Sequence, residues 1–321
     1  MRKWAPIIVI SCLLLFFIWW NSEAPVGGGV YPEKQVGVEL LVVEEGSLLV
    51  PMTLPVRWIK TYPWEQTPVL NEISLFDEEG NIISAIGGEY KLRIPHEYDW
   101  YDRNIQGEIE LYLNGASFAE EGSISTTTLK DSVNTMYSLN RISLVNNQKR
   151  RNFPIDNNYQ YHLKPEIGIE KLWEMQGLMY FFLDQNFDTP NGFLITLTGK
   201  PGHSLEEIGF WLPGMPPNYF EEHVQYNYTS NTDQYNNSSE DFVGENLFFP
   251  ETLEERSMVI YFPFTPEMID AAGDSLLRLM PYFHLRNEVG ESYFTGGYGS
   301  IGPLDRTISW GEFIYKPDKK H

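Results

Sequence analysis

The sequence predicts an all-β class of fold, mainly β with minor helix, in which an N-terminal transmembrane helix precedes two tandem β-sandwich domains. Three observations support this prediction. An uncharged apolar run extends from Trp4 to Trp20. After Val36, short runs rich in β-branched and aromatic residues alternate with turn-forming residues about every ten positions. A strand that ends at a proline recurs in both halves of the chain, which suggests a duplicated domain.

The N-terminal apolar run has the length and flanks of a membrane anchor. It contains about 17 residues, just enough for a helix to cross a hydrocarbon core of roughly 30 Å. Arg2 and Lys3 precede the run and Glu23 follows it, so the positive-inside rule places the N-terminus in the cytoplasm. We therefore expect a signal-anchor in residues 1–24 of a single-pass cell-membrane protein, with the C-terminal bulk extracytoplasmic.

Two other fates of this segment stay open. A signal peptidase could cut after Ala24, which would secrete the chain, although Pro25 would then be an unfavourable first residue. The residues ending at Cys12 (Val-Ile-Ser-Cys) are similar to a bacterial lipobox, and Cys12 would then carry the lipid. The apolar stretch before Cys12 is short, however, and further apolar residues follow it, so we favour a retained helix.

The composition excludes several partners and chemistries. The chain contains 44 Asp and Glu against 23 Lys and Arg, for a formal net charge of −21. So acidic a protein repels nucleic acid, which is therefore not an expected partner. Cys12 is the only cysteine. No internal disulfide can form, and thiolate zinc sites and cysteine nucleophiles are excluded beyond the apolar run.

Composition and pattern divide the rest of the chain. Residues 25–35 contain several glycines and are expected to form a flexible spacer. The two β-sandwich domains are expected in residues 36–150 and 151–321, joined through a polar linker near residues 149–158. The second domain contains a long polar insertion near residues 216–246, which we interpret as a surface loop.

Strands are expected where apolar and polar residues alternate, or where short apolar runs lie between turns. In the first domain these are residues 38–43, 48–58, 73–76, 82–86, 90–94, 109–113 and 138–145. In the second domain they are residues 178–183, 193–198, 208–212, 258–264, 276–285 and 310–315. Between residues 79 and 81 we predict a hairpin turn, and after Thr265 a short helical turn that ends before Gly273.

The suspected duplication compares two segments. Residues 90–94 end at Pro95, and residues 260–264 end near Pro266; each is followed by a short acidic segment, a glycine and another strand candidate. In this strand–turn rhythm the chain resembles the bacterial immunoglobulin-like modules of cell-envelope proteins. The resemblance implies that both domains are immunoglobulin-like.

Two aromatic clusters beside proline turns are the candidates for a binding face. Their members are Trp58, Tyr62, Trp64, Tyr98, Trp100 and Tyr101. Clustered aromatic rings stack on sugars or form the hot spots of protein interfaces, so a protein or glycan partner of the cell envelope is expected. The same residues commonly pack small β cores, and that structural role is the more frequent one.

One segment has the oxygen spacing of a calcium loop. Asp184, Asn186 and Asp188 place oxygen atoms at alternate positions, as wrapping a hard cation requires. Thr189 and Ile195 stand where an EF-hand needs glycine and glutamate. A hairpin turn explains the same residues more simply, so we expect no cofactor and retain Ca²⁺ as the alternative.

A basic cluster, Lys149-Arg150-Arg151, interrupts the acidic chain. It could recruit an anionic ligand. An isolated basic cluster in a linker is more often only solvated, and that is what we expect here.

The sequence contains no motif strong enough to name an activity. It has no Gly-x-Ser-x-Gly elbow, phosphate-binding glycine loop or His-Glu-x-x-His helix. We therefore predict a non-enzymatic binding or accessory module of the cell envelope. The alternatives are a carbohydrate-active hydrolase that uses paired carboxylates, and a calcium-dependent adhesion module.

Overall fold

The computed structural model describes residues 5–22, 26–43, 49–94, 98–99, 101–114, 136–146, 148–155, 159–165, 176–183, 190–198, 201–229, 244–253, 257–279, 281–290, 292–296, 299–301, 311–312 and 314–318. Strands dominate these residues and form four sheets. Within them, every strand pairing is antiparallel except the two that strand β2 makes with β10 and β18. The prediction of a mainly β protein with minor helix is confirmed.

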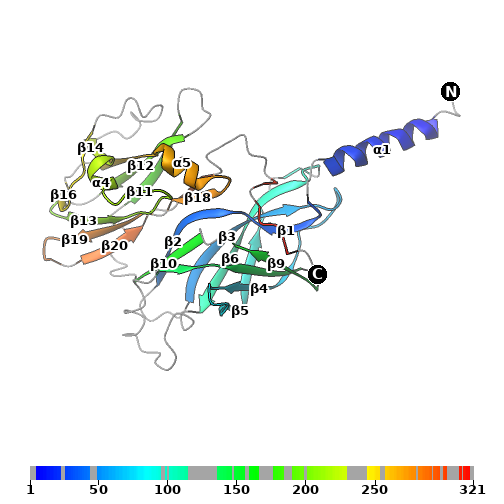
Figure 1. Cartoon of the computed structure of the whole chain (residues 1–321), viewed down its shortest axis with the longest axis horizontal. Helices are drawn as coiled ribbons and strands as arrows, with labels where there is room; N and C mark the ends of the chain where they lie inside the picture. Colours follow the sequence, from blue (N-terminus) through cyan, green and yellow to red (C-terminus); the bar gives the residue numbers. More distant parts are fainter. Residues whose placement is uncertain are drawn as a thin grey trace.

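The N-terminal apolar run forms one helix, α1 (Ala5–Ser22), which projects away from the strands (Figure 1). Large apolar side chains are exposed along its length: Ile7, Ile8, Val9, Ile10, Leu13, Leu14, Leu15, Phe17, Ile18 and Trp19. Within the described part of the chain, no helix has both the length and the apolar character that a membrane crossing requires.

The first β body is built on a seven-stranded sheet. Its strands, in spatial order, are β1 (Gly29–Pro32), β3 (Leu49–Ile59), β6 (Asn104–Asn114), β5 (Ile82–Arg93), β4 (Leu70–Phe76), β8 (Arg141–Asn146) and β9 (Lys149–Pro154). The predicted hairpin between β4 and β5 is present, because Asp77 N–H donates to the Asn81 carbonyl oxygen at 3.1 Å.

Alternating side chains of this sheet form the first hydrophobic core. Leu54 lies opposite Ile109, and Trp58 lies opposite Ile105, in the β3–β6 pairing. All four side chains are buried, as is Leu111. Between them Glu108 and Glu110 are only half-buried, which confirms the alternation expected for residues 109–113. Such cross-strand pairs on one face are the unit of sheet stabilisation.

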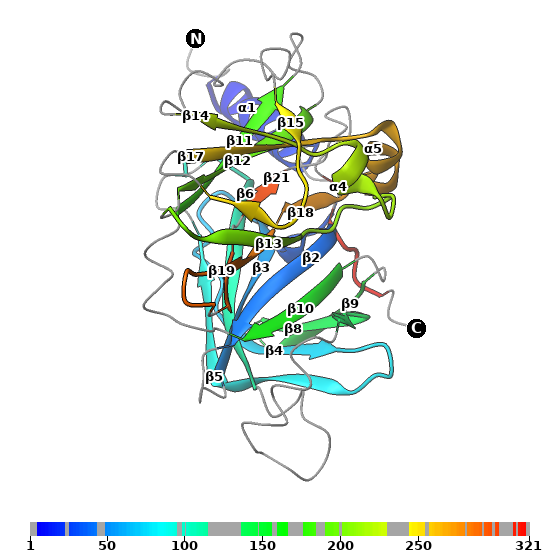
Figure 2. The ribbon, with the colours of Figure 1, turned by 90° about the vertical axis from the view of Figure 1, so that its left-hand side faces the viewer.

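A five-stranded sheet connects the two halves of the molecule. Its order is β21 (Gly299–Ile301), β18 (Leu276–Leu279), β2 (Gln35–Val43), β10 (Tyr159–Pro165) and β7 (Met136–Ser138). Strand β2 runs parallel to β10 on one side and to β18 on the other. Two segments far along the chain therefore lie beside a strand close to its start, as Figure 2 shows for β2 and β10.

The second β body contains the two remaining sheets. One has the order β11 (Gln176–Leu183), β12 (Pro190–Thr198), β17 (Ser257–Pro263), β14 (Gln225–Thr229) and β15 (Glu245–Asn246). The other has the order β16 (Glu251–Thr252), β13 (Ser204–Gly209), β19 (Tyr282–Arg286) and β20 (Ser292–Gly296). The labels of β11, β12, β13, β14, β16, β19 and β20 lie together at the left of Figure 1.

Both sheets of the second body contribute to a second hydrophobic core. Phe193 of β12 stacks on Phe262 of β17, with ring centroids 4.7 Å apart and planes at 4°. From the other sheet, Ile208 and its partner Phe283 belong to the same buried cluster. Apolar faces of two sheets thus bury each other, which supplies the main favourable term in folding.

Two short helices complete this body, α4 (Tyr219–Glu222) and α5 (Pro266–Ala272). The Thr265 hydroxyl caps α5 by accepting a hydrogen bond from Met268 N–H at 3.3 Å, and Gly273 ends the helix. The predicted helical turn followed by a strand is therefore confirmed.

Several predicted segments have a different structure. Residues 25–35 were expected to be a spacer, but β1 and the beginning of β2 lie there. The linker expected at 149–158 contains β9, so the predicted domain boundary after residue 150 falls inside a strand. Residues 216–246 include α4 and β14, and Tyr219 there is fully buried. In these segments strand pairing or core packing overrides the local composition, and β9 pairs with the strand just before it, β8.

The strand expected at residues 310–315 is also different. Among its described members, Ile314 forms an isolated bridge with Glu33, and residues 311–312 form a turn.

Replacing Gly37 by alanine is expected to destabilise the β2–β18 contact. Gly37 has a φ of +131°, and an added Cβ would lie 2.7 Å from the Arg278 carbonyl oxygen. Strain of this kind costs about 1–3 kcal/mol, so the thermal midpoint, followed by circular dichroism, should fall. Gly27→Ala is the control, because nothing lies within 4 Å of its added Cβ. An unchanged midpoint for Gly37→Ala would contradict the close approach of β2 and β18.

Candidate functional site

Helix α1 is attached to the first β body through Trp20. The Trp20 side chain is 1% exposed, and its Nε1–H donates to the Thr61 carbonyl oxygen at 3.2 Å. The Arg103 guanidinium lies 5.4 Å from the centroid of the Trp20 ring and also donates to the Trp20 carbonyl oxygen. The C-terminal end of α1 is therefore held by side-chain and backbone contacts.

Two loops form this attachment. One follows β3 and contains Lys60 and Thr61; the other precedes β6 and contains Arg103. Lys60 N–H donates to the Arg103 carbonyl oxygen at 2.9 Å, and Arg103 Nε–H donates back to the Lys60 carbonyl oxygen at 3.2 Å. The loops extend from adjacent strands, so the sheet itself brings them together at the base of α1.

Two of the predicted aromatic residues belong to the core beneath these loops. Trp58 is fully buried, and Tyr98 packs edge-on against it with ring centroids 5.8 Å apart. The buried Lys60 ammonium lies 5.5 Å from the Trp58 centroid and 4.5 Å from that of Tyr98, so it makes cation–π contacts with both rings. Burial lowers the pKa of Lys60, against the opposing charges of Asp102 and Glu65. Trp58 and Tyr98 therefore have a packing role.

Three other predicted aromatic residues are on the surface of the same loops. Tyr62, Trp64 and Tyr101 are 42%, 71% and 47% exposed. The Tyr62 and Trp64 rings lie 5.4 Å apart, close to the contacts that hold Trp20. Trp100 lies outside the described residues. The structure thus divides the predicted binding face into a pair that packs in the core, in which Trp58 is buried and Tyr98 partly buried, and an exposed aromatic group at the base of α1.

The predicted calcium loop cannot be placed in the structure. Asp184, Asn186 and Asp188 all lie outside the described residues. Elsewhere, among the residues that are described, no three His, Cys, Asp or Glu side chains come together as a metal site would need.

A cavity of about 230 Å³ opens beside the exposed aromatic loop. Its lining comes from residues far apart in sequence: Gly28, Gly29, Val30, Thr61, Glu65, Leu70, Leu144, Asn146, Lys149 and Arg151. Two members of the basic cluster therefore line a cavity instead of a solvated linker. Sequence reasoning missed this site, although recognising residues 149–154 as a strand would have placed Lys149 and Arg151 on one face.

A buried ion pair lies beneath the same end of the sheet. Arg57 Nε is 2.7 Å from Glu33 Oε1, and the Glu33 side chain is fully buried. Burial is the main cause that raises the pKa of Glu33 to about 7, while the charge of Arg57 lowers it. Glu33 N–H donates to the Pro55 carbonyl oxygen at 3.0 Å, and Tyr315 N–H donates to that of Pro32 at 2.9 Å. The pair is thus enclosed between β1, β3 and the C-terminal segment.

Comparisons with known proteins assign no family. No protein-family model matches the sequence, and no curated protein matches it. Among solved structures, a chicken T-cell receptor is 10% identical, with 82% of this chain and 98% of that chain covered and a TM-score of 0.22. The BSP domain of a biofilm-associated protein is 9% identical, with 87% and 59% covered and a TM-score of 0.28. This chain spans just over half of the latter.

Glu33→Gln is expected to change how stability depends on pH. The folded pKa of about 7 lies above the usual 4.5, so the folded state binds this proton more tightly than the unfolded state. The resulting stabilisation is complete below the usual pKa and is lost as pH rises through the folded pKa. Between about pH 5 and pH 8 the wild type should therefore lose roughly 1–3 kcal/mol relative to Glu33→Gln, measured by urea unfolding.

The control for this measurement is Glu110→Gln, which removes a carboxyl from an ion pair with Arg93 on the same sheet, where both side chains are partly exposed. Parallel pH profiles for the wild type and Glu33→Gln would show that the buried carboxyl does not titrate in this range.

Trp20→Ala is expected to loosen the attachment of α1. Truncating a buried tryptophan typically costs about 3–5 kcal/mol, and here it also removes the partner of the Arg103 guanidinium. Cleavage by a protease between α1 and β1 should become faster, with a lower thermal midpoint in detergent. Trp19→Ala is the matched control, because Trp19 is the neighbouring residue of the same type and is 45% exposed. Equal cleavage rates in the two variants would refute a specific role for Trp20.

Proposed function

We propose that this protein is a membrane-anchored, extracytoplasmic binding or accessory module of the cell envelope, without enzymatic activity. In this proposal, α1 tethers two immunoglobulin-like β-sandwich domains to the bilayer. The observation that carries the proposal is the apolar, outward-facing surface of α1, fixed at one end to an acidic β body. The facing sheets of the second body support the sandwich architecture.

Lipid is the environment that we propose for α1. A helix that is apolar on every side is typical of a protein core or a membrane. The side chains of Leu14, Leu15 and Ile18 are 58%, 65% and 65% exposed. Exposed apolar surface of this extent marks a contact with lipid or with another protein. Arg2 and Lys3 precede the helix, which favours a cytoplasmic N-terminus and an extracytoplasmic body.

The exposed aromatic group supports a binding role close to the membrane surface. Tyr62, Trp64 and Tyr101 lie on the two loops that hold the base of α1, where the chain would leave the bilayer in this proposal. Tyrosine and tryptophan are enriched at membrane–water interfaces because their rings have an apolar body and a polar edge. The cluster of Trp58, Tyr98 and Lys60 packs beneath these loops. The proposed binding face would therefore meet headgroups, or a protein or glycan partner at that level.

Cell fractionation tests the anchor. The wild-type chain is expected to remain in the membrane pellet after carbonate washing, and protease added to cells with a permeabilised outer layer should digest its body. Leu14→Arg places a charge in the apolar helix, at a cost of about 2.5–3.5 kcal/mol for insertion at its centre, and should shift the chain to the soluble fraction.

Val289→Arg is the matched control, because Val289 is also apolar and exposed, at 80%, but lies between β19 and β20. It should leave the distribution unchanged. A wild-type chain that is washed off with carbonate, or a body protected from protease, would overturn the proposed location.

A further inference from the structure

We infer that the cavity beside the base of α1 is a binding site for a phosphate group, held by Lys149 and Arg151. The inference deepens the proposed function, because it names a ligand class for the membrane-proximal end of the molecule. Phosphate, either free or in a lipid headgroup, is the chemistry that this pair of cations fits. A guanidinium offers a planar fork of donors to phosphate oxygens, and an ammonium adds a compact charge.

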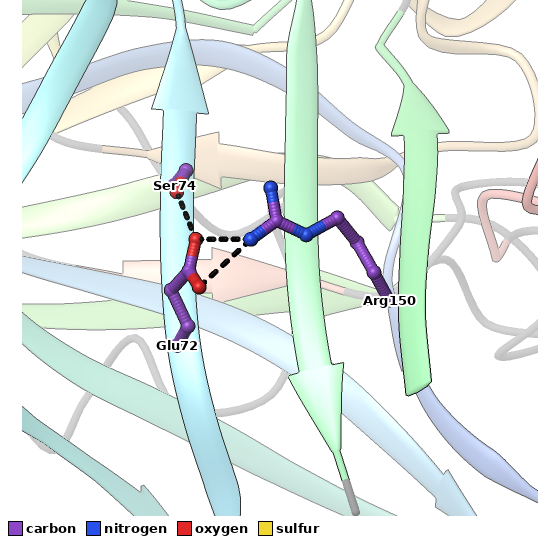
Figure 3. Close-up of polar contacts among 3 residues, drawn as sticks. All are labelled: Glu72, Ser74 and Arg150. Carbon is purple, nitrogen blue, oxygen red and sulfur yellow. Dashed lines mark hydrogen bonds and ion pairs between the residues drawn. The ribbon is translucent and has the colours of Figure 1, made fainter. Parts of the chain in front are cut away.

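Because side chains alternate along a strand, the three basic residues of the cluster point to two different faces of β9. Lys149 and Arg151 lie on one face of β9, together with the buried Phe153, and both line the cavity. Arg150 points to the opposite face, where its Nη2 donates to the two Glu72 carboxylate oxygens at 2.7 and 2.8 Å (Figure 3). The charge of Arg150 is thus neutralised within the sheet, whereas the other two charges remain at the cavity.

Arg151 is positioned before any ligand arrives. Its Nη2 donates to the Gly28 carbonyl oxygen at 2.7 Å, and its guanidinium lies 5.3 Å from the centroid of the Tyr31 ring. Its Nη1 is buried, and among the described residues it has no hydrogen-bond partner. Leaving a buried charged donor unsatisfied is costly, so a phosphate oxygen that reached Nη1 after a small movement of the Arg151 side chain would be stabilising.

Glycine at position 29 makes this arrangement sterically feasible. An added Cβ at Gly29 would collide with Nη1 of Arg151, and the φ of +142° is one that other residues rarely adopt. The guanidinium therefore lies directly against the backbone of β1, with its orientation restricted.

Acidic side chains do not neutralise the positive charge of the cavity lining. Glu65 is the acidic side chain in the lining, and its carboxylate accepts a hydrogen bond from Thr61 N–H. The lining therefore keeps one excess positive charge. The chain as a whole carries a charge of −21, but charges more than about 8 Å away are strongly screened at physiological ionic strength. The cavity can thus bind an anion although the protein as a whole repels anionic surfaces.

Thermal unfolding of the full chain in neutral detergent micelles tests the site directly. Adding inorganic phosphate, compared with chloride at equal ionic strength, should raise the unfolding midpoint by several degrees. Lys149→Gln and Arg151→Gln should reduce that shift at least threefold. Arg150→Gln removes the same charge from the neighbouring position and should retain the shift.

Lys149→Gln is the decisive variant, because the exposed Lys149 side chain makes no ion pair with any described residue. Its folding is therefore expected to be unaffected, whereas Arg151→Gln also loses the contact with Gly28. The same comparison in phosphatidylcholine nanodiscs, with and without phosphatidic acid, identifies the source of the phosphate.

Stabilisation by phosphatidic acid that Lys149→Gln removes would assign the site to a lipid headgroup, and stabilisation by inorganic phosphate alone would assign it to a soluble ligand. No shift with either probe, or equal shifts in Lys149→Gln and Arg150→Gln, would overturn the inference. Because the micelle experiment does not depend on cellular location, it can succeed even if fractionation refutes the proposed anchor.

Discussion

The position of β2 between two strands from distant parts of the chain is the constraint on which the rest of the structure depends. β2 pairs in parallel with β10 on one edge and with β18 on the other. Leu276 N–H donates to the Lys34 carbonyl oxygen at 2.7 Å, and Lys34 forms an ion pair with Asp274. Val36 belongs to the second hydrophobic core although it lies in a strand close to the first. The two β bodies are therefore joined by sheet hydrogen bonds and by shared apolar packing.

Local elements of the fold could be predicted because their causes are local. The alternation around Ile109, the turn at Gly80 and the Thr265 cap each depend on residues within a few positions. Parallel pairing has no such signal, since its partners lie more than 100 residues apart in sequence. β1 and β9 were missed for a different reason, which is that their own residues give a weak strand signal. β1 is a four-residue segment that contains glycine and proline, and β9 begins with three basic residues although it forms a hairpin with the preceding strand β8.

The candidate site shows the same limit. Trp58 and Trp64 are equally aromatic, yet one is fully buried and the other is 71% exposed. The difference could have been predicted from the alternation of side chains along a strand. Trp58 points to the same face as Leu54 and Val56, whereas Trp64 follows the end of β3. The cavity could not have been found in this way. Its walls combine residues near 28, 61 and 151, which meet only after the seven-stranded sheet has formed.

Strand β1 connects the features proposed to carry function. It follows α1 directly, and its first residues, Gly29 and Val30, line the cavity. Its last residue precedes Glu33, whose carboxyl is buried against Arg57 and has a pKa raised to about 7. A shift of β1 would therefore alter the contact between Gly29 and Arg151 at one end and the packing of the ion pair at the other. Because β1 is only four residues long and lies at the edge of its sheet, few strand hydrogen bonds oppose a shift of this kind.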